Sequence, residues 1–335
     1  MVYYESTNKA LKFAALTLLV SMGYASSQID SQQTRSDKAP DSEVRVSLPV
    51  RSPTIPAARS NANIQVDVNL VLIPVTVTDP IGAAVSGLRS DAFRLFEDGV
   101  EQKIRYFLMQ DGPISMGLVF DASRSMTLRL ETARAAISQF LAMSRPGDEY
   151  FLLEFNNDLR LLQDFTTDIR EIESALPQIH ATGWTSLLDA IYFAINRMRH
   201  AANTRHALLV LSDGGDNSSR YSEGEVRSLA READVCIYAI GMLGAGLSKS
   251  NVRFLTELAE NTGGSLHAVR KLDELPDTMH KVSTALRNQY LLGYVPTNLA
   301  EDGLYRKIEV RIVQPVDFPP LRALWRAGYY APAGR

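Results

Sequence analysis

The sequence predicts an α/β fold: a doubly wound domain with a mostly parallel sheet, inserted in or flanked by a small β module. Three observations predict this class. Between residues 112 and 286, short apolar runs alternate with segments of helical length, as in parallel sheets that helices cover on both faces. Segments with strand-like alternation precede and follow that region. Residues with oxygen-bearing side chains stand at the ends of two apolar runs.

The expected strands of the α/β domain are short and almost wholly apolar. They cover residues 114–120, 150–155, 207–211, 235–240 and, with a weaker signal, 265–268. Between them, apolar residues that recur every three or four positions predict two amphipathic helices. One has Ala133, Ala136, Ile137, Phe140 and Leu141 on its apolar face, and the other has Leu187, Ala190, Ile191, Ala194 and Ile195. Residues 159–165 are expected to add an edge strand.

The segment before the α/β domain is predicted to form strands. Its apolar positions change parity at Pro74, between Leu72 and Val75, which predicts a bulge or a kink there. Further on, Asp98-Gly99 predicts a hairpin between strands at 93–96 and 103–107.

The segment after the α/β domain is also predicted to form strands. They are expected at 290–294, 306–313 and 321–330. Because each of the two sets of strands is too small to be stable alone, we expect the early and late strands to share one core.

The first 25 residues have the layout of a secretory signal peptide, in which Lys9 and Lys12 precede an apolar stretch and small residues follow. The apolar stretch is shorter than the ~20 residues that a membrane span needs. We therefore expect export to the periplasm or the extracellular space, and no transmembrane span in the mature chain. The remaining expected boundaries are a disordered tether at 26–63, N-terminal strands at 64–111, the α/β domain at 112–286 and C-terminal strands at 287–335.

The composition is that of a globular protein, with 45% hydrophobic and 22% charged residues among 335. The formal net charge is -3 and the sequence has no basic stripe, which argues against a nucleic acid as partner. Cys236, the single cysteine, lies in an apolar run and is interpreted as a small buried hydrophobe. The five histidines lack the spacing of a zinc site.

Three polar segments provide candidate ligands for a hard cation. Asp121-Ala-Ser123-Arg-Ser125 follows the run 114–120, Thr185 opens a predicted helix, and Asp213 follows the run 207–211. Carboxylate and hydroxyl oxygens are the ligands that Mg²⁺ prefers. Each segment also has an ordinary local role, because such residues commonly cap helices or form turns. The combination of all three at strand ends and a helix start favours the cation site.

These segments, in this order, resemble the metal-ion-dependent adhesion site of the von Willebrand factor A (VWA) family, which has an Asp-x-Ser-x-Ser loop, a distant Thr and a distant Asp. The resemblance implies a Rossmann-like sheet in which Asp121 and Asp213 face one crevice. Two converging carboxylates repel each other unless a cation lies between them. The resemblance further implies that Ser123 and Ser125 bind the ion directly, Thr185 directly or through water, and both aspartates mainly through water or hydrogen bonds.

A site of this kind keeps one replaceable position on the ion. The resemblance therefore implies a non-enzymatic binding or adhesion module, with Mg²⁺ (or Mn²⁺ or Ca²⁺) as cofactor. Its partner would be a protein or extracellular ligand that supplies a carboxylate. The flanks, with Phe96-Glu-Asp-Gly99 and Tyr290-Leu-Leu-Gly-Tyr294 among their motifs, resemble the exported bacterial VWFA-related proteins of the Acidobacteria type. Arg124 departs from the family, in which many relatives carry Gly at this position.

Two other functions stay open from the sequence. One is a metal-assisted phosphohydrolase with Asp121 as nucleophile, although no second carboxylate follows two residues later and no phosphate-binding loop is present. The other is a structural envelope protein that the metal stabilises. The oligomeric state is also left open, and so is a shift of the last helix, expected at 273–287, when the metal site changes state.

Four residues near the cation ligands have less certain roles. Asp189 is interpreted as a helix residue, and Asp216 and Asn217 as parts of a solvated loop. Trp184 is either an aromatic that faces a partner or a packed lid.

Overall fold

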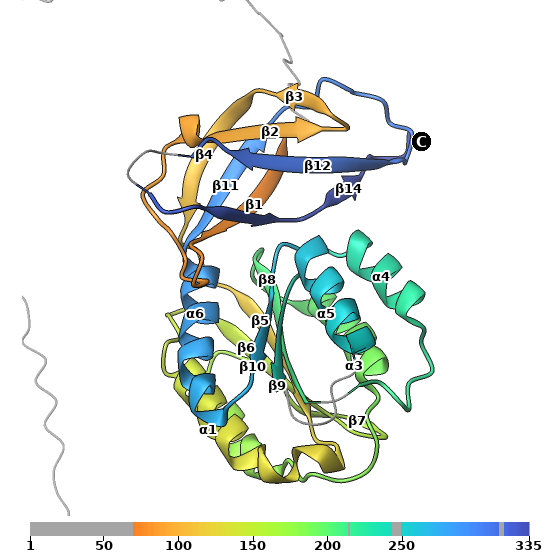
Figure 1. The fold of residues 1–335 in the computed structure, drawn as a ribbon. Coiled ribbons are helices and arrows are strands. Elements are labelled where there is room, and N and C mark those ends of the chain that lie inside the picture. The colour runs from red at the N-terminus through yellow and green to blue at the C-terminus, as the bar shows by residue number, and fades with distance from the viewer. Residues whose placement is uncertain (1–69, 214, 243–248, 315–317, 335) are drawn as a thin grey trace, which may run out of the picture. The chain divides into compact units, whose positions relative to one another are not determined.

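The computed structural model describes residues 70–213, 215–242, 249–314 and 318–334 (Figure 1). The predicted signal peptide and tether lie outside these residues. No helix in the described ranges is long and apolar enough to cross a membrane.

A six-stranded sheet forms the centre of the α/β domain (Figure 1). Five strands are parallel, and the sixth, β7, pairs antiparallel with β6 at one edge. The strand order is β10-β9-β8-β5-β6-β7, which confirms the predicted doubly wound class. The strands are β5 Ser115–Asp121, β6 Glu149–Phe155, β7 Leu159–Thr166, β8 His206–Ser212, β9 Cys236–Met242 and β10 Leu266–Val269.

Helices cover both faces of this sheet. One face packs against α1 Leu130–Leu141, α2 Ile169–Ala175 and α6 Leu275–Arg287, and the other against α3 Leu187–Arg197, α4 Glu223–Glu232 and α5 Lys249–Asn261. Short 3₁₀ helices occur at η1 Ser90–Ala92, η2 Arg124–Leu128, η3 Leu176–Gln178, η4 Met198–His200 and η5 Leu272–Glu274. Because β5 lies between β6 and β8, the strand order reverses there, and the segments after β5 and β8 lead to helices on opposite faces.

Two four-stranded sheets flank the α/β domain in the sequence, and both combine early and late strands. Their orders are β13-β1-β11-β4 and β14-β12-β2-β3. Their inner faces share one apolar core, which includes Val75, Leu95, Tyr290 and Ile308. The strands are β1 Val71–Thr78, β2 Phe93–Glu97, β3 Val100–Gln102, β4 Ile104–Gln110, β11 Gln289–Tyr294, β12 Tyr305–Ile312, β13 Arg322–Trp325 and β14 Gly328–Tyr330.

The bulge predicted at Pro74 is wrong. Strand β1 pairs with β11 in continuous register from Val71 to Thr76, through Pro74. The buried hydrophobic positions are Ile73, Val75 and Val77, so the parity of the apolar residues is constant, and Leu72 is exposed instead. Pro74 precedes the first residue of β1 that pairs with β13. Proline has no backbone N–H to donate, but this costs no ladder hydrogen bond on the side of β1 that faces β13.

The hairpin at Asp98-Gly99 forms, but with a different second strand. Both turn residues have positive φ angles, 47° and 83°, as a two-residue hairpin turn requires. Strand β2 pairs with β3, whereas β4 belongs to the other sheet. The single late strand predicted at 321–330 is likewise divided into β13 and β14, which lie in different sheets.

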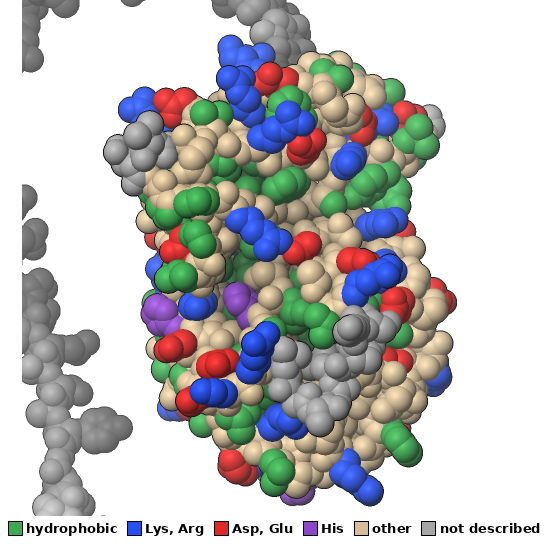
Figure 2. Space-filling view, in the orientation of Figure 1, with side chains coloured by type: hydrophobic (Ala, Val, Ile, Leu, Met, Phe, Trp, Pro, Cys, Tyr) green, Lys and Arg blue, Asp and Glu red, His purple; other side chains and the backbone are tan. Residues whose placement is uncertain are grey.

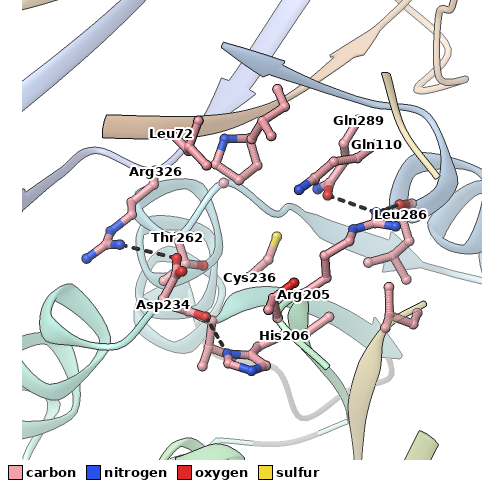
Figure 3. A pocket seen from close by; sticks show the side chains of 17 residues that line it. Leu72, Gln110, Arg205, His206, Asp234, Cys236, Thr262, Leu286, Gln289 and Arg326 are labelled. Carbon is pink, nitrogen blue, oxygen red and sulfur yellow. Dashed lines mark hydrogen bonds and ion pairs between the residues drawn. The ribbon is translucent and has the colours of Figure 1, made fainter. Parts of the chain in front are cut away.

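Arg205 joins the α/β domain to the flanking strands. Its guanidinium donates to Gly112 O (2.6 Å), to Leu286 O at the end of α6 and to Gln289 Oε1 at the start of β11 (3.2 Å). Figure 3 shows this side chain directed toward Leu286 and Gln289, across a pocket of about 240 Å³ that Cys236 also lines. Desolvation raises the pKa of the Cys236 thiol to about 12, so the thiol is neutral, but the residue is half-buried at the pocket and not fully buried as the sequence predicted.

Candidate metal centre

Asp121 is the last residue of β5 and is fully buried. Its Oδ1 accepts a hydrogen bond from Ser123 N (2.8 Å), and its Oδ2 accepts one from Ser212 Oγ (2.5 Å). Burial, with a smaller contribution from the nearby charge of Asp213, raises the pKa of Asp121 to about 6, against the opposing effect of these hydrogen bonds. A carboxylate enclosed in this way is positioned to hold other groups, and it is poorly placed to attack a substrate.

Ser123, Ser125 and Asp213 form a chain of hydrogen bonds between the segments that follow β5 and β8. The two serine Oγ atoms are 2.9 Å apart, and Ser125 Oγ donates to Asp213 Oδ1 at 2.6 Å. Asp213 is 2% exposed. The topological switch at β5 therefore brings together the hydroxyls of one loop and the carboxylate of the other.

Thr185 stands just before α3. It lines a cavity of about 430 Å³ that Ser123 and Ser125 also line. The lining residues are Ser123, Arg124, Ser125, Gly183, Trp184, Thr185 and Asn217. All five predicted site residues thus lie around one crevice at the carboxyl edge of the sheet, four linked through hydrogen bonds and Thr185 through the shared cavity.

Asn217 positions Thr185. This role was not predicted from the sequence, because Asn217 was interpreted as part of a solvated loop. Its Oδ1 accepts a hydrogen bond from Thr185 N (2.8 Å), and Thr185 O accepts one from Asn217 N (3.0 Å). Asp216 Oδ1 accepts one from Leu188 N (3.3 Å) at the start of α3. The only signal in the sequence is that these polar residues follow Asp213 closely. Their partners are about 30 positions away, so spacing alone does not identify them.

Asp189 and Trp184 have clear structural placements. The Asp189 carboxylate, in the first turn of α3, accepts hydrogen bonds from Arg220 N (2.8 Å) and Tyr221 N (2.9 Å). It therefore holds the segment after Asp213 and is interpreted as structural, as the sequence indicated. Trp184 is 65% exposed, so it is not a packed lid.

The chemistry of this cluster fits a hard divalent cation. Its candidate donors are carboxylate and hydroxyl oxygens, which such ions prefer over nitrogen and sulfur. A cation beside Asp121 would also offset the cost of burying its charge. Among the described residues, no group of three or more His, Cys, Asp or Glu side chains is placed to hold a metal ion. This cluster therefore depends on its hydroxyls as well as on its two carboxylates.

The fold and the site together define the class of protein. It is a doubly wound α/β protein with two aspartates and three hydroxyls around the crevice at its switch point. Residues 116–215 match the family model of the von Willebrand factor type A domain. This match lies within the α/β part of the chain, which is therefore identified as a von Willebrand factor type A domain.

Two curated relatives align over parts of the chain. Integrin alpha-X from Homo sapiens is 25% identical over 192 residues, which cover 54% of this chain and 16% of the integrin. An uncharacterized protein from Borreliella burgdorferi is 29% identical over 131 residues, which cover 38% of this chain and 37% of that protein. This chain thus spans well under two thirds of the length of either relative.

Two solved structures are similar to parts of this chain at low sequence identity. A von Willebrand factor type A protein from Catenulispora acidiphila has a TM-score of 0.49 at 11% identity, covering 80% of this chain and 75% of its own. Proximal thread matrix protein 1 from the mussel byssus, with a zinc-occupied MIDAS motif, has a TM-score of 0.48 at 19% identity. The match covers 56% of this chain and 50% of the mussel protein.

Proposed function

We propose that this protein is a binding module that recognises an acidic residue of a protein or extracellular ligand through a divalent cation. Asp121, Ser123, Ser125, Thr185 and Asp213 would hold Mg²⁺, or Mn²⁺ or Ca²⁺ in its place. The single observation that carries the proposal is the hydrogen-bonded chain Ser123–Ser125–Asp213 beside buried Asp121. Ser123 and Ser125 also line a cavity together with Thr185, which supports a shared site for the three hydroxyls.

The residues divide into two roles. Asp121 has hydrogen bonds to both carboxylate oxygens, so it would stabilise the loop and lend negative charge. Ser123, Ser125 and Thr185 line the cavity, so their hydroxyls would face the ion. When bound, the cation supplies a Lewis-acidic centre that accepts a further oxygen ligand. An aspartate or glutamate of the partner would provide that ligand.

The exposed surface beside the cavity is suited to a protein partner. Trp184 is largely exposed, and Arg124, also exposed, lines the same cavity. An aromatic ring and a guanidinium are common contact groups in protein interfaces. By contrast, the face shown in Figure 2 carries interspersed Lys, Arg, Asp and Glu side chains, without the basic stripe that a nucleic acid would require.

Calorimetry with Mg²⁺ and Mn²⁺ tests the metal site. We expect the wild type to bind, and Ser123→Ala or Thr185→Ala to bind about tenfold more weakly, which corresponds to about 1.4 kcal/mol. The matched control is Ser174→Ala, because this exposed serine donates only to Glu171 O within α2. Equal affinities in all four proteins would contradict the proposed ligands.

Capture of proteins from bacterial envelope extract tests the recognition step. The wild type and Thr185→Ala are each used as bait, once with Mg²⁺ and once with a chelator. A specific partner should appear only with wild type and Mg²⁺. If the same proteins are recovered under all four conditions, cation-dependent recognition is excluded, whatever the calorimetry shows.

A further inference from the structure

Arg129 contacts the candidate metal centre directly. It immediately precedes α1, and its Nη1 donates to Asp213 Oδ2 at 2.5 Å and to Ser125 O at 3.0 Å. The Arg129 side chain is 24% exposed, whereas that of Asp213 is 1% exposed. The contact is therefore a charge-assisted hydrogen bond to a carboxylate that water scarcely reaches.

The position of Arg129 is unusual for a cation. The N-terminus of a helix carries a partial positive charge, which disfavours a guanidinium beside it. Contact with Asp213 offsets this cost. Among the described residues, Arg129 is the single cation in ion-pair contact with either Asp121 or Asp213. It therefore neutralises one of the two buried carboxylates from within the chain.

The same carboxylate is a candidate for the cation. Asp213 Oδ1 accepts a hydrogen bond from Ser125 Oγ, and Oδ2 accepts one from Arg129. The positive charge of Arg129 therefore already offsets part of the Asp213 negative charge that would otherwise balance a metal ion. A divalent ion and a guanidinium at one carboxylate also repel each other, the more strongly because the site is shielded from water. Arg129 should therefore lower the affinity for metal and leave a bound ion with excess positive charge.

We propose that Arg129 is an internal counterion of the metal centre, which holds Asp213 in place without metal and makes metal binding weak until an anionic ligand completes the site. This inference rests on the proposed function. It deepens that function, because an ion with unbalanced charge favours a carboxylate over a neutral ligand. Arg129 is thus a positioning residue whose charge sets how strongly metal and acidic partner depend on each other.

Calorimetric titration with Mg²⁺ alone tests the proposal on wild type, Arg129→Gln and Arg124→Gln. Both variants lose one positive charge near the cavity, but the Arg124 side chain, unlike that of Arg129, makes no hydrogen bond or ion pair with another described residue. We expect Arg129→Gln to bind Mg²⁺ about tenfold more tightly and Arg124→Gln to change affinity less than about threefold. Equal changes in the two variants, or weaker binding by Arg129→Gln, would overturn the internal counterion.

Thermal unfolding in chelator provides a second readout that needs no partner. Arg129→Gln should have a lower Tm than wild type without metal, since Asp213 loses its counterion, and should gain more Tm on adding Mg²⁺. Arg129→Lys, which keeps the charge, should stay close to wild type in both measurements. A metal-free Tm unchanged by Arg129→Gln would contradict the holding role.

The outcomes separate the two proposals. If wild type and every variant fail to take up Mg²⁺ and Mn²⁺, the metal centre itself is wrong. If wild type, Arg129→Gln and Arg124→Gln bind with the same affinity while Ser123→Ala and Thr185→Ala bind more weakly, only the role of Arg129 is wrong.

Discussion

At the scale of single residues, the candidate site depends on backbone contacts that fix its hydroxyls. Asn217 is the clearest case, because it exchanges hydrogen bonds with the Thr185 backbone. We expect Asn217→Ala to weaken Mg²⁺ binding about fivefold, the effect of losing one hydrogen bond of about 1 kcal/mol. Asn217→Asp keeps the accepting oxygen and should bind at least as tightly as wild type. The measurement is calorimetry, and unchanged affinity in Asn217→Ala would contradict the positioning role.

The ligand types were predictable from the sequence, whereas the residues that hold them were not. Asp121, Ser123 and Ser125 form a short local motif at the end of an apolar run, so their chemistry is visible in the sequence. Ser212 and Arg129 act through contacts that span 91 and 84 positions. Such contacts arise only when the sheet brings separate strand ends together, and no local pattern encodes them.

At the scale of elements, the loop before α3 carries Thr185 and depends on one glycine. Gly183 has a φ of 74°, which L-residues with a Cβ rarely adopt, and an added Cβ would lie 2.0 Å from Asn157 Oδ1. We expect Gly183→Ala to lower the free energy of unfolding by about 1–3 kcal/mol and to weaken Mg²⁺ binding, because the loop must shift. Urea unfolding and calorimetry measure the two effects.

Gly224→Ala is the matched control. Gly224 lies in the first turn of α4, where an added Cβ would be 3.8 Å from Ser222 Oγ. Alanine should therefore be neutral or stabilise by up to about 1 kcal/mol. If Gly183→Ala and Gly224→Ala changed the free energy of unfolding equally, backbone strain at Gly183 would not explain the loss of stability.

Element types were predicted more reliably than their partners. Alternation and apolar runs identify strands because they report burial. They do not report which sheet a strand joins. Val100–Gln102 is too short and too polar for its pattern to mark it as the partner of β2. At Pro74, apolar residues at positions 66, 68, 70 and 72 suggested a change of parity, but Leu72 is exposed.

At the scale of the whole molecule, burial within the fold changes the charge state of one titratable group. His267 lies in β10, and its Nε2 is 2.9 Å from Ser265 Oγ. Burial, together with the positive charge of Lys281 on α6, lowers the pKa of His267 from 6.5 to about 4. The folded protein therefore keeps this imidazole neutral.

The sign of the pH dependence follows from linkage. Between pH 4 and pH 6.5 the unfolded chain binds a proton at His267 that the folded chain does not, so stability rises with pH in this window. On acidification from pH 7 to pH 4, this group should remove up to about 3 kcal/mol of unfolding free energy. The glutamine in His267→Gln cannot titrate. Between pH 7 and pH 4 this variant should therefore lose about 3 kcal/mol less unfolding free energy than wild type. Urea unfolding of both proteins at pH 7, 5.5 and 4 measures the difference, and parallel curves would show that the imidazole is accessible to protons in the folded state.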